Sequence, residues 1–326
     1  MSTLGANTIR VYHVDPDANH DDCMSAFASH NIYLFLDLDT FTTQFEQMTP
    51  YWNQTQMKAF SAVLDSFQSY SNLAGVFVAN EALTFLNKSD VAPYIKASIR
   101  DMKTYRDLKN YRAIPVGYAG QYLLFSSSEV SDLLSYRTFD GIGWRYWLAI
   151  GPRVYNTQHF HRHRLTKLCY LGADITELRP MLQNYLACPS VASTANPHDT
   201  VTADFFALNV YEWCGHSSFQ TSGYSDLIKN STNVQIPIFI SETGCREPRP
   251  RLFTDQNSVL GDDMSDSWSG AIVYEWIQEA NDYGLISYGA LVDANDEEAL
   301  DGYPRKGEEF PRQAHVTGSF RDISHA

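Results

Sequence analysis

The stretch Leu73-Ala-Gly-Val-Phe-Val-Ala-Asn80-Glu81 decides how this 326-residue chain folds. Residues Val76 to Val78 form a continuous apolar run, which is typical of a parallel strand that is covered on both faces. The run ends abruptly in an amide and a carboxylate. In barrels of alternating strands and helices, the residues that carry chemistry lie at the carboxyl ends of the strands. We therefore expect Asn80 and Glu81 at such an end.

A second stretch has the same form, Ile236-Pro-Ile-Phe-Ile-Ser241-Glu242. An isolated strand-end glutamate is usually a surface carboxylate, but two glutamates in matching contexts favour a functional pair. We predict that Glu81 and Glu242 face each other across one cleft.

The rest of the chain alternates between strand and helix patterns. Further strands are predicted at 7–12, 32–37, 113–118, 205–211 and 271–274, and helices at 22–28, 54–70 and 91–108. This alternation indicates parallel βαβ units and an α/β fold, a (β/α)8 TIM-type barrel. Only seven strands are present, and the eighth would precede residue 1. We therefore expect a barrel that lacks strand 1 and has two unpaired edges.

The interval after the predicted strand 113–118 is too long for a βα unit, and the excess falls in Gly120–Gly172. This segment is basic in an acidic chain and has no clear hydrophobic period. We expect an aberrant insertion after strand 5, such as a retained intron, that is not part of the functional enzyme; a functional lid is the alternative. Its three histidines, His159, His161 and His163, predict no metal site, because no carboxylate or cysteine stands at ligand spacing.

Composition limits the partners of the protein. The net charge of −14 disfavours a nucleic-acid surface, which needs a basic footprint. No run of about twenty apolar residues predicts a membrane span. The first residues do not have the pattern of a signal peptide, and the last ones do not have that of a lipid-anchor signal. Three sequons, at Asn53, Asn87 and Asn230, nevertheless hint at secretion.

A set of motifs runs through the chain. They are Leu4–Tyr12 with Val14-Asp15-Pro16, Asn19–Met24, Asn80-Glu81, Ile114–Tyr118, Glu177–Cys188, Asn209–Gly215 with Phe219–Tyr224, Ser241-Glu242 with Gly244-Cys245, Trp268–Gly270, Val273–Trp276 and Gln278–Asn281. Together they resemble the fungal cell-surface β-1,3-glucanosyltransferases of glycoside hydrolase family 72. The resemblance covers most of residues 4–288, except 120–172. It divides the chain into a catalytic barrel (1–288) and an irregular tail (289–326).

The resemblance implies an activity and roles for single residues. It implies retaining cleavage of a β-1,3-glucan donor and transfer to an acceptor chain in cell-wall assembly, without a cofactor or metal. Glu242 matches the nucleophile and Glu81 the general acid/base. Cleavage of a glycosidic bond with retention needs two carboxyl groups about 5 to 5.5 Å apart, and we predict this separation for Glu81 and Glu242. The residues that match the sugar-binding positions are Tyr12, Asp37, Asn80, Tyr211 and Tyr274. Family members are held at the outer face of the plasma membrane by a lipid, so a cell-surface location is implied.

The resemblance also implies the disulfide pattern. Cys214 and Cys245 keep both members of a family pair, so their Cα atoms are expected within about 4.4 to 6.8 Å. Cys23 and Cys188 lack their family partners in this chain and are expected to be unpaired. One residue departs from the family beside the nucleophile, where Thr243 replaces an aromatic residue.

Two other functions remain open from the sequence. The missing strand favours an inactive remnant or a glucan-binding scaffold. A different retaining β-glycanase would share the positions of Glu81 and Glu242 and differ in substrate. Incubation with reduced laminari-oligosaccharides distinguishes them, because longer products indicate a transferase, only shorter products a hydrolase, and unchanged substrate a remnant.

Overall fold

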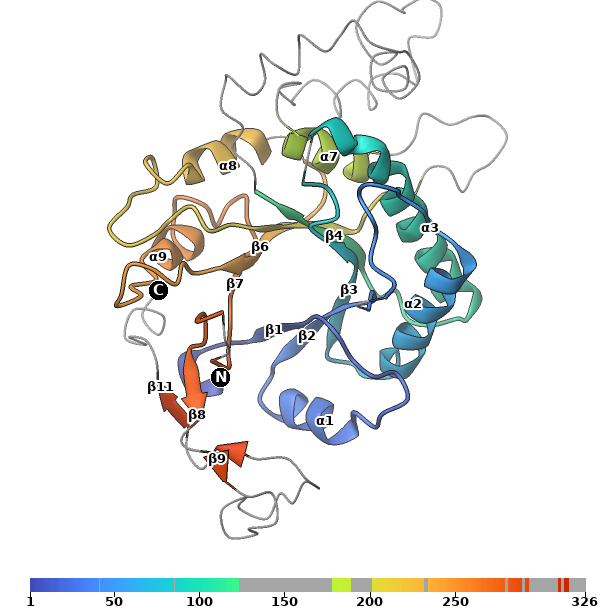
Figure 1. Cartoon of the computed structure of the whole chain (residues 1–326), viewed down its shortest axis with the longest axis horizontal. Helices are drawn as coiled ribbons and strands as arrows, with labels where there is room; N and C mark the ends of the chain where they lie inside the picture. Colours follow the sequence, from blue (N-terminus) through green and yellow to red (C-terminus); the bar gives the residue numbers. More distant parts are fainter. Residues whose placement is uncertain are drawn as a thin grey trace, which may run out of the picture.

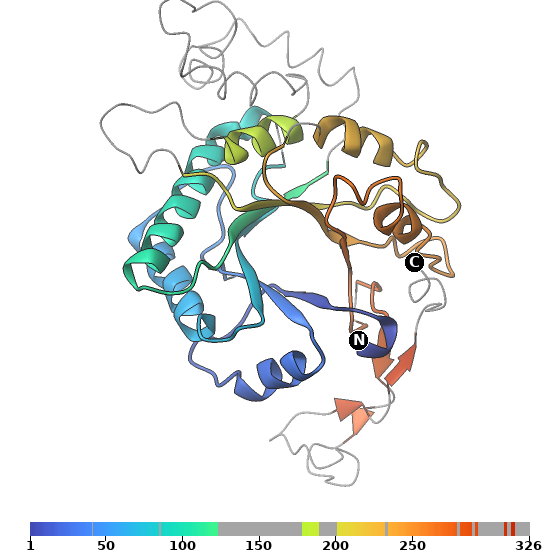
Figure 2. The same cartoon turned by 180° about the vertical axis from the view of Figure 1, so that it is seen from behind.

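Seven parallel strands form a curved wall with helices on its outside (Figure 1). This computed structural model describes residues 1–40, 42–84, 86–122, 178–188, 201–231, 234–278, 281–288, 291–292, 310–311 and 314–316. The same ring is seen from behind in Figure 2. The predicted α/β barrel with parallel strands is confirmed.

The strands pair in the order in which they occur in the chain. They are β1 (Thr8–Val11), β2 (Tyr33–Asp37), β3 (Leu73–Asn80), β4 (Val116–Gln121), β5 (Phe205–Asn209), β6 (Ile238–Thr243) and β7 (Ala271–Val273). Each corresponds to one of the seven predicted strands. Sequential parallel pairing brings all seven carboxyl ends to one end of the ring.

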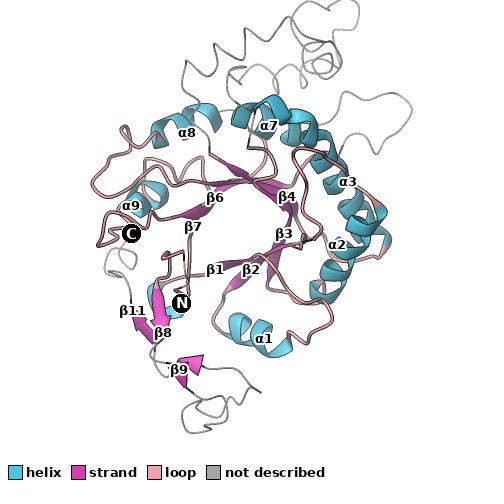
Figure 3. Ribbon diagram, in the orientation of Figure 1, coloured by secondary structure: helices cyan, strands magenta, loops and turns pink. Residues whose placement is uncertain are grey.

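Helices cover the outer face of this sheet (Figure 3). They are the α-helices α1 (Asp21–Ser29), α2 (Gln54–Phe67), α3 (Ala92–Leu108), α7 (Leu178–Ala187), α8 (Tyr224–Ser231) and α9 (Asp255–Leu260), and the 3-10 helices η1 (Ser2–Leu4) and η2 (Leu86–Val91). Helix α2 begins with a capping box, in which Asn53 and Gln56 each accept from the other's backbone amide. The predicted helices at 22–28, 54–70 and 91–108 are α1, α2 and α3.

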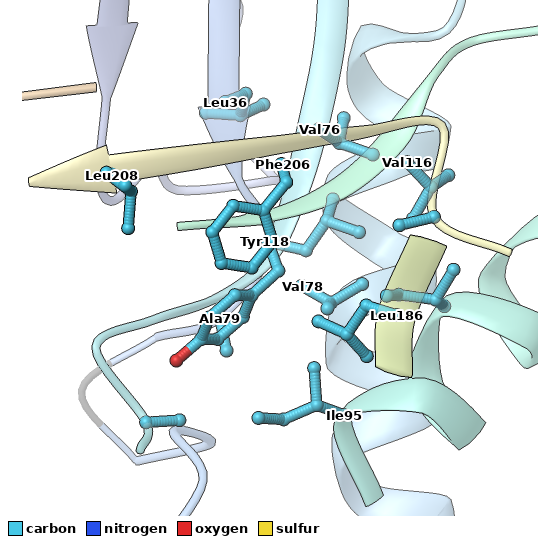
Figure 4. Close-up of a cluster of buried hydrophobic side chains, with 14 of the residues drawn as sticks. Leu36, Val76, Val78, Ala79, Ile95, Val116, Tyr118, Leu186, Phe206 and Leu208 are labelled. Atoms are coloured by element: carbon cyan, nitrogen blue, oxygen red, sulfur yellow. The ribbon is translucent and has the colours of Figure 1, made fainter. Parts of the chain in front are cut away.

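The main hydrophobic core lies between the sheet and these helices. Figure 4 shows part of it, where Val76 and Val78 of β3 and Val116 of β4 lie near Ile95 of α3 and Leu186 of α7. All five side chains are buried. The continuous apolar run of β3 is thus explained in part by its outward residues, which pack under the helices.

A second, aromatic cluster fills the inside of the ring. Phe77, Phe205 and Phe239 pack there with their ring centroids 5.1 to 6.2 Å apart. Gly117 makes room for this cluster, because a Cβ atom at this position would lie 2.5 Å from the Phe205 ring. The cluster lies beneath the polar residues at the carboxyl ends of the strands, where the Arg10 guanidinium lies over the Phe77 ring.

The ring is open on one side, between β1 and β7. Within the part of the chain that the structure describes, these two strands do not pair with each other. A cavity of about 810 Å³ lies along them, lined by residues of both strands and by η1. The expected barrel with two unpaired edges is therefore present among the described residues.

Two segments differ from their predicted descriptions. Strand β4 continues through Gln121, and Tyr122 is buried, so the first residues of the predicted insertion belong to the barrel. Residues 123–172 of the insertion, with its three histidines, lie outside the described residues. In the predicted irregular tail, β9 (Leu291–Val292) pairs antiparallel with β10 (Phe310–Pro311). Strand β11 (Ala314–Val316) pairs antiparallel with β8 (Ile286–Tyr288), which precedes the tail.

Candidate active site

Irregular pairing at the strand ends aims several side chains into the mouth of the barrel. From the pair Phe77–Gly117 to the pair Asn80–Ala119, β3 advances by three residues and β4 by two. A similar register shift between β5 and β6 precedes the pair Asn209–Glu242. Such bulges turn side chains that regular pleating would direct elsewhere. Glu81 follows directly with φ of 48°, a left-handed conformation that is uncommon outside glycine. Strain of this kind is concentrated at functional sites.

Arg10 of β1 is the centre of the polar network, and its side chain is only 1% exposed. It donates to both carboxylate oxygens of Asp37, at 2.8 and 2.6 Å. It also donates to Asn80 Oδ1 at 3.1 Å, Asn209 Oδ1 at 3.4 Å and Glu242 Oε1 at 3.3 Å. One guanidinium therefore connects the ends of β1, β2, β3, β5 and β6.

Glu242 is surrounded by hydrogen-bond donors. Tyr12 donates to its Oε1 at 2.8 Å and Tyr211 to its Oε2 at 2.9 Å, in addition to Arg10. Burial raises the pKa of the Glu242 carboxyl above its ordinary value, while Arg10 and the two phenols act to lower it. Donors on both oxygens hold this carboxylate in one orientation and stabilise its charged form.

Glu81 belongs to the same network through Asn209. The amide nitrogen of Asn209 donates to Glu81 Oε1 at 2.8 Å and to Asn80 Oδ1 at 2.9 Å. Its amide oxygen accepts from Arg10 and from Ser241. Glu81 also lies close enough to Glu242 for its charge to raise the pKa of the Glu242 carboxyl. The two glutamates thus share one site, and the retaining separation of their oxygens stays a prediction.

Four tyrosines form a continuous wall beside Glu242. Tyr12 contacts Tyr274, Tyr274 contacts Tyr283, and Tyr283 contacts Tyr211, with ring centroids 6.2, 5.4 and 5.6 Å apart. Arg251 supports the wall by donating to the backbone carbonyl groups of Tyr274 and Tyr283. Aromatic rings with polar tips are suited to contact sugar rings.

The structure brings together all seven residues predicted as catalytic or sugar-binding. It adds three whose roles the sequence argument missed, Arg10, Asn209 and Tyr283. A signal for Arg10 was present, because a charged residue in the short strand Thr-Ile-Arg-Val needs a buried partner. Asn209 ends a fully buried strand in the same way as Asn80, but an amide at a strand end is a weak signal by itself.

The predicted disulfide between Cys214 and Cys245 is confirmed, with Cα atoms 5.3 Å apart. Both sulfur atoms lie 3.1 Å from the carbonyl oxygen of Tyr211, so the bridge supports the loop that carries this phenol. Cys23 is free, as expected. Cys188 is disulfide-bonded, and the prediction that it has no partner is wrong. The family pairing from which that prediction came takes no account of Cys169, which lies outside the described residues.

Loss of the Cys214–Cys245 bridge is expected to destabilise the protein by about 3 to 4 kcal/mol, because the bond closes a 31-residue separation and restricts the unfolded chain. Denaturant unfolding of the double variant Cys214→Ser/Cys245→Ser measures this change. Cys23→Ser is the matched control, since Cys23 is free and exposed. An unchanged unfolding midpoint in the double variant contradicts the prediction.

Thr243, which follows Glu242 in the chain, is buried. Its hydroxyl donates to Asp255 Oδ2 at 2.8 Å and lies 3.4 Å from the Tyr224 hydroxyl. The Thr243 side chain therefore contacts α8 and α9.

Among the described residues, no group of three or more His, Cys, Asp or Glu could hold a metal ion. No helix in the described part of the chain is long and apolar enough to cross a membrane.

A barrel with two strand-end glutamates in one polar network is the arrangement expected of a glycoside hydrolase. The profile of glycoside hydrolase family 72, described as "Glucanosyltransferase", matches residues 1–138 and 152–312. The chain therefore belongs to this family. The match leaves out only residues 139–151 of the predicted insertion.

Named relatives agree with this assignment. The chain is 38% identical over 287 residues to the 1,3-beta-glucanosyltransferase gas2 of Schizosaccharomyces pombe, covering 88% of this chain and 51% of that protein. It is 32% identical to gel1 of Aspergillus fumigatus, covering 97% and 56% of the two chains. A structure of a Saccharomyces cerevisiae Gas2p mutant in complex with laminaritetraose and laminaripentaose matches with a TM-score of 0.70 and 28% identity, covering 99% and 55%. The chain spans about half the length of these relatives.

Proposed function

We propose that this protein cleaves β-1,3-glucan chains with retention and transfers them to an acceptor glucan at the fungal cell surface. The observation that carries the proposal is the unequal hydrogen bonding of the two glutamates. Glu242 accepts from Arg10, Tyr12 and Tyr211, which suits an ionised nucleophile. Among the described residues, one side chain donates to the Glu81 carboxyl group, that of Asn209 to Oε1, so that Oε2 can carry the proton exchanged with the substrate.

Two displacement steps follow from these roles. In the first, Glu81 gives its proton to the glycosidic oxygen, the C–O bond breaks, and a Glu242 oxygen bonds to the anomeric carbon. In the second, Glu81 takes the proton of an acceptor hydroxyl, whose oxygen bonds to the anomeric carbon as the bond to Glu242 breaks. A glucan acceptor gives transfer, and water gives hydrolysis.

The surrounding residues support these steps. The amide of Asn209 donates to Asn80 and to Glu81, so both amides lie beside the Glu81 carboxyl group, where a sugar hydroxyl can be held. Tyr12, Tyr211 and Tyr274 offer ring faces and hydroxyls beside the nucleophile. Asp37 fixes Arg10 through two hydrogen bonds and in this way contributes to the site. The Gas2p structure contains laminari-oligosaccharides, which are therefore the class of ligand to test first.

Incubation of the protein with reduced laminari-oligosaccharides tests the proposal. Products longer than the substrate support a transferase. Only shorter products would instead indicate a retaining β-glycanase, and unchanged substrate a glucan-binding scaffold. Retention itself is read from the anomeric configuration of the first products.

Glu81→Gln is expected to lower the rate of transfer by about 10² to 10⁴-fold, because the leaving oxygen is no longer protonated. A substrate whose leaving group departs without a proton can still form the glycosyl-enzyme in this variant. The glycosyl-enzyme then accumulates, since no base activates the acceptor. Mass spectrometry should find the sugar on the peptide that contains Glu242. A sugar on any other peptide contradicts the assignment.

A further inference from the structure

Asp39 is a buried acid that the proposed mechanism does not use. It follows β2 by two residues, and the amide of the intervening Leu38 still donates to the carbonyl of Phe77 in β3. Leu38 packs in the outer core, whereas Asp37 contacts Arg10 inside the ring. Side chains alternate along an extended chain, so Asp39 lies on the inner side, nearer the mouth than Asp37. Its exposed fraction is 4%.

The surroundings of Asp39 disfavour its charged form. Its Oδ1 has no hydrogen-bond partner among the described residues. Among the described residues, the charged and titratable groups next to it are Asp37 at the end of β2, Arg10 on β1, and His13, whose Nδ1 lies 3.2 Å from the Asp39 carbonyl oxygen. Arg10 already donates to Asp37 and Glu242. Burial and the Asp37 charge raise the pKa of Asp39 to about 8.

We propose that Asp39 is a positioning residue that must be protonated for the site to work. With a neutral Asp39, the positive charge of Arg10 faces two anions, Asp37 and Glu242. An ionised Asp39 adds a third anion to this buried cluster and competes with Glu242 for the same cation. The nucleophile then loses part of the interaction that orients it. This inference rests on the proposed function, because it is measured through the activity of the site.

The first test compares the pH dependence of kcat/KM for the wild type, Asp39→Asn and Asp39→Ala. Each profile is normalised to its own maximum. In both variants the alkaline half-activity point is expected to move upward by about one pH unit or more, because the titrating group is gone. Asp22→Asn, an exposed acid on α1, is the matched control and should retain the wild-type profile. Coinciding profiles of the wild type and both Asp39 variants would show that Asp39 does not set the alkaline limit, and would overturn the proposal.

The second test uses stability and needs no substrate. A folded-state pKa above the ordinary carboxyl value means that the folded protein keeps a proton that the unfolded chain releases. The contribution of Asp39 to stability is then full below about pH 4 and is lost as pH rises towards 8. The unfolding midpoint of Asp39→Asn, relative to that of the wild type, should therefore increase as the pH rises from 5 to 8. A constant difference overturns the proposal.

The two tests separate this inference from the proposed function. A wild-type protein that neither lengthens nor shortens laminari-oligosaccharides at any pH removes the proposed function, and the inference with it. An active wild type whose profile matches those of both Asp39 variants removes only the inference.

Discussion

Replacing Glu242 by glutamine is expected to reduce transfer between laminari-oligosaccharides by about 10⁴-fold or more, because an amide cannot form the glycosyl-enzyme. Glutamine has the shape of glutamate, and its one oxygen can still accept from either Tyr12 or Tyr211. Binding of laminaripentaose should therefore persist, and only the chemical step should be lost. Initial rates from chromatography and the dissociation constant from calorimetry separate the two effects.

Asp226→Asn provides the matched control for Glu242→Gln. It makes the same acid-to-amide change at an exposed position on the outer helix α8 and should retain the wild-type rate. A Glu242→Gln variant with more than about a tenth of the wild-type rate would remove Glu242 as the nucleophile. Similar circular dichroism spectra of wild type and variant exclude misfolding as the cause of a loss.

Arg10→Met is expected to destabilise the protein by roughly 3 to 5 kcal/mol, because it leaves the carboxylate of Asp37 buried without its cation. Asp37 is only 2% exposed and receives two hydrogen bonds from Arg10. Transfer activity should also fall, since Glu242 loses its cation and Asn80 and Asn209 lose a shared donor. Denaturant unfolding measures the first effect and the oligosaccharide assay the second.

The double variant Arg10→Met/Asp37→Leu distinguishes stability from function at this position. Removing both charges should restore much of the lost stability, because no unpaired ion remains buried. It should not restore activity, because the orientation of Glu242 still lacks Arg10. Arg100→Met is the control: its surface pair with Asp101 is partly exposed, and its loss should cost about 1 kcal/mol or less. An active double variant would show that Arg10 serves the fold alone.

The amino-acid sequence by itself determined the architecture of the described barrel. The period and composition of the apolar runs were sufficient to predict seven strands. A buried parallel strand gives a continuous apolar run in the sequence, such as Val76 to Val78 in β3. The two glutamates were also visible, since a charge that ends an apolar run is a local feature. The bridge between Cys214 and Cys245 came from the family resemblance, and the structure confirms it.

Only the tertiary structure decided how the site is connected. Arg10 and Glu242 are 232 residues apart in the chain, and their contact depends on ring curvature and on register shifts at the ends of β3, β5 and β6. Register shifts of one residue leave almost no mark on composition, yet they decide which side chains point inward. The buried state of Asp39 has the same origin. Its environment is assembled from β1, β2 and the loop after β1, and no local pattern around residue 39 encodes it.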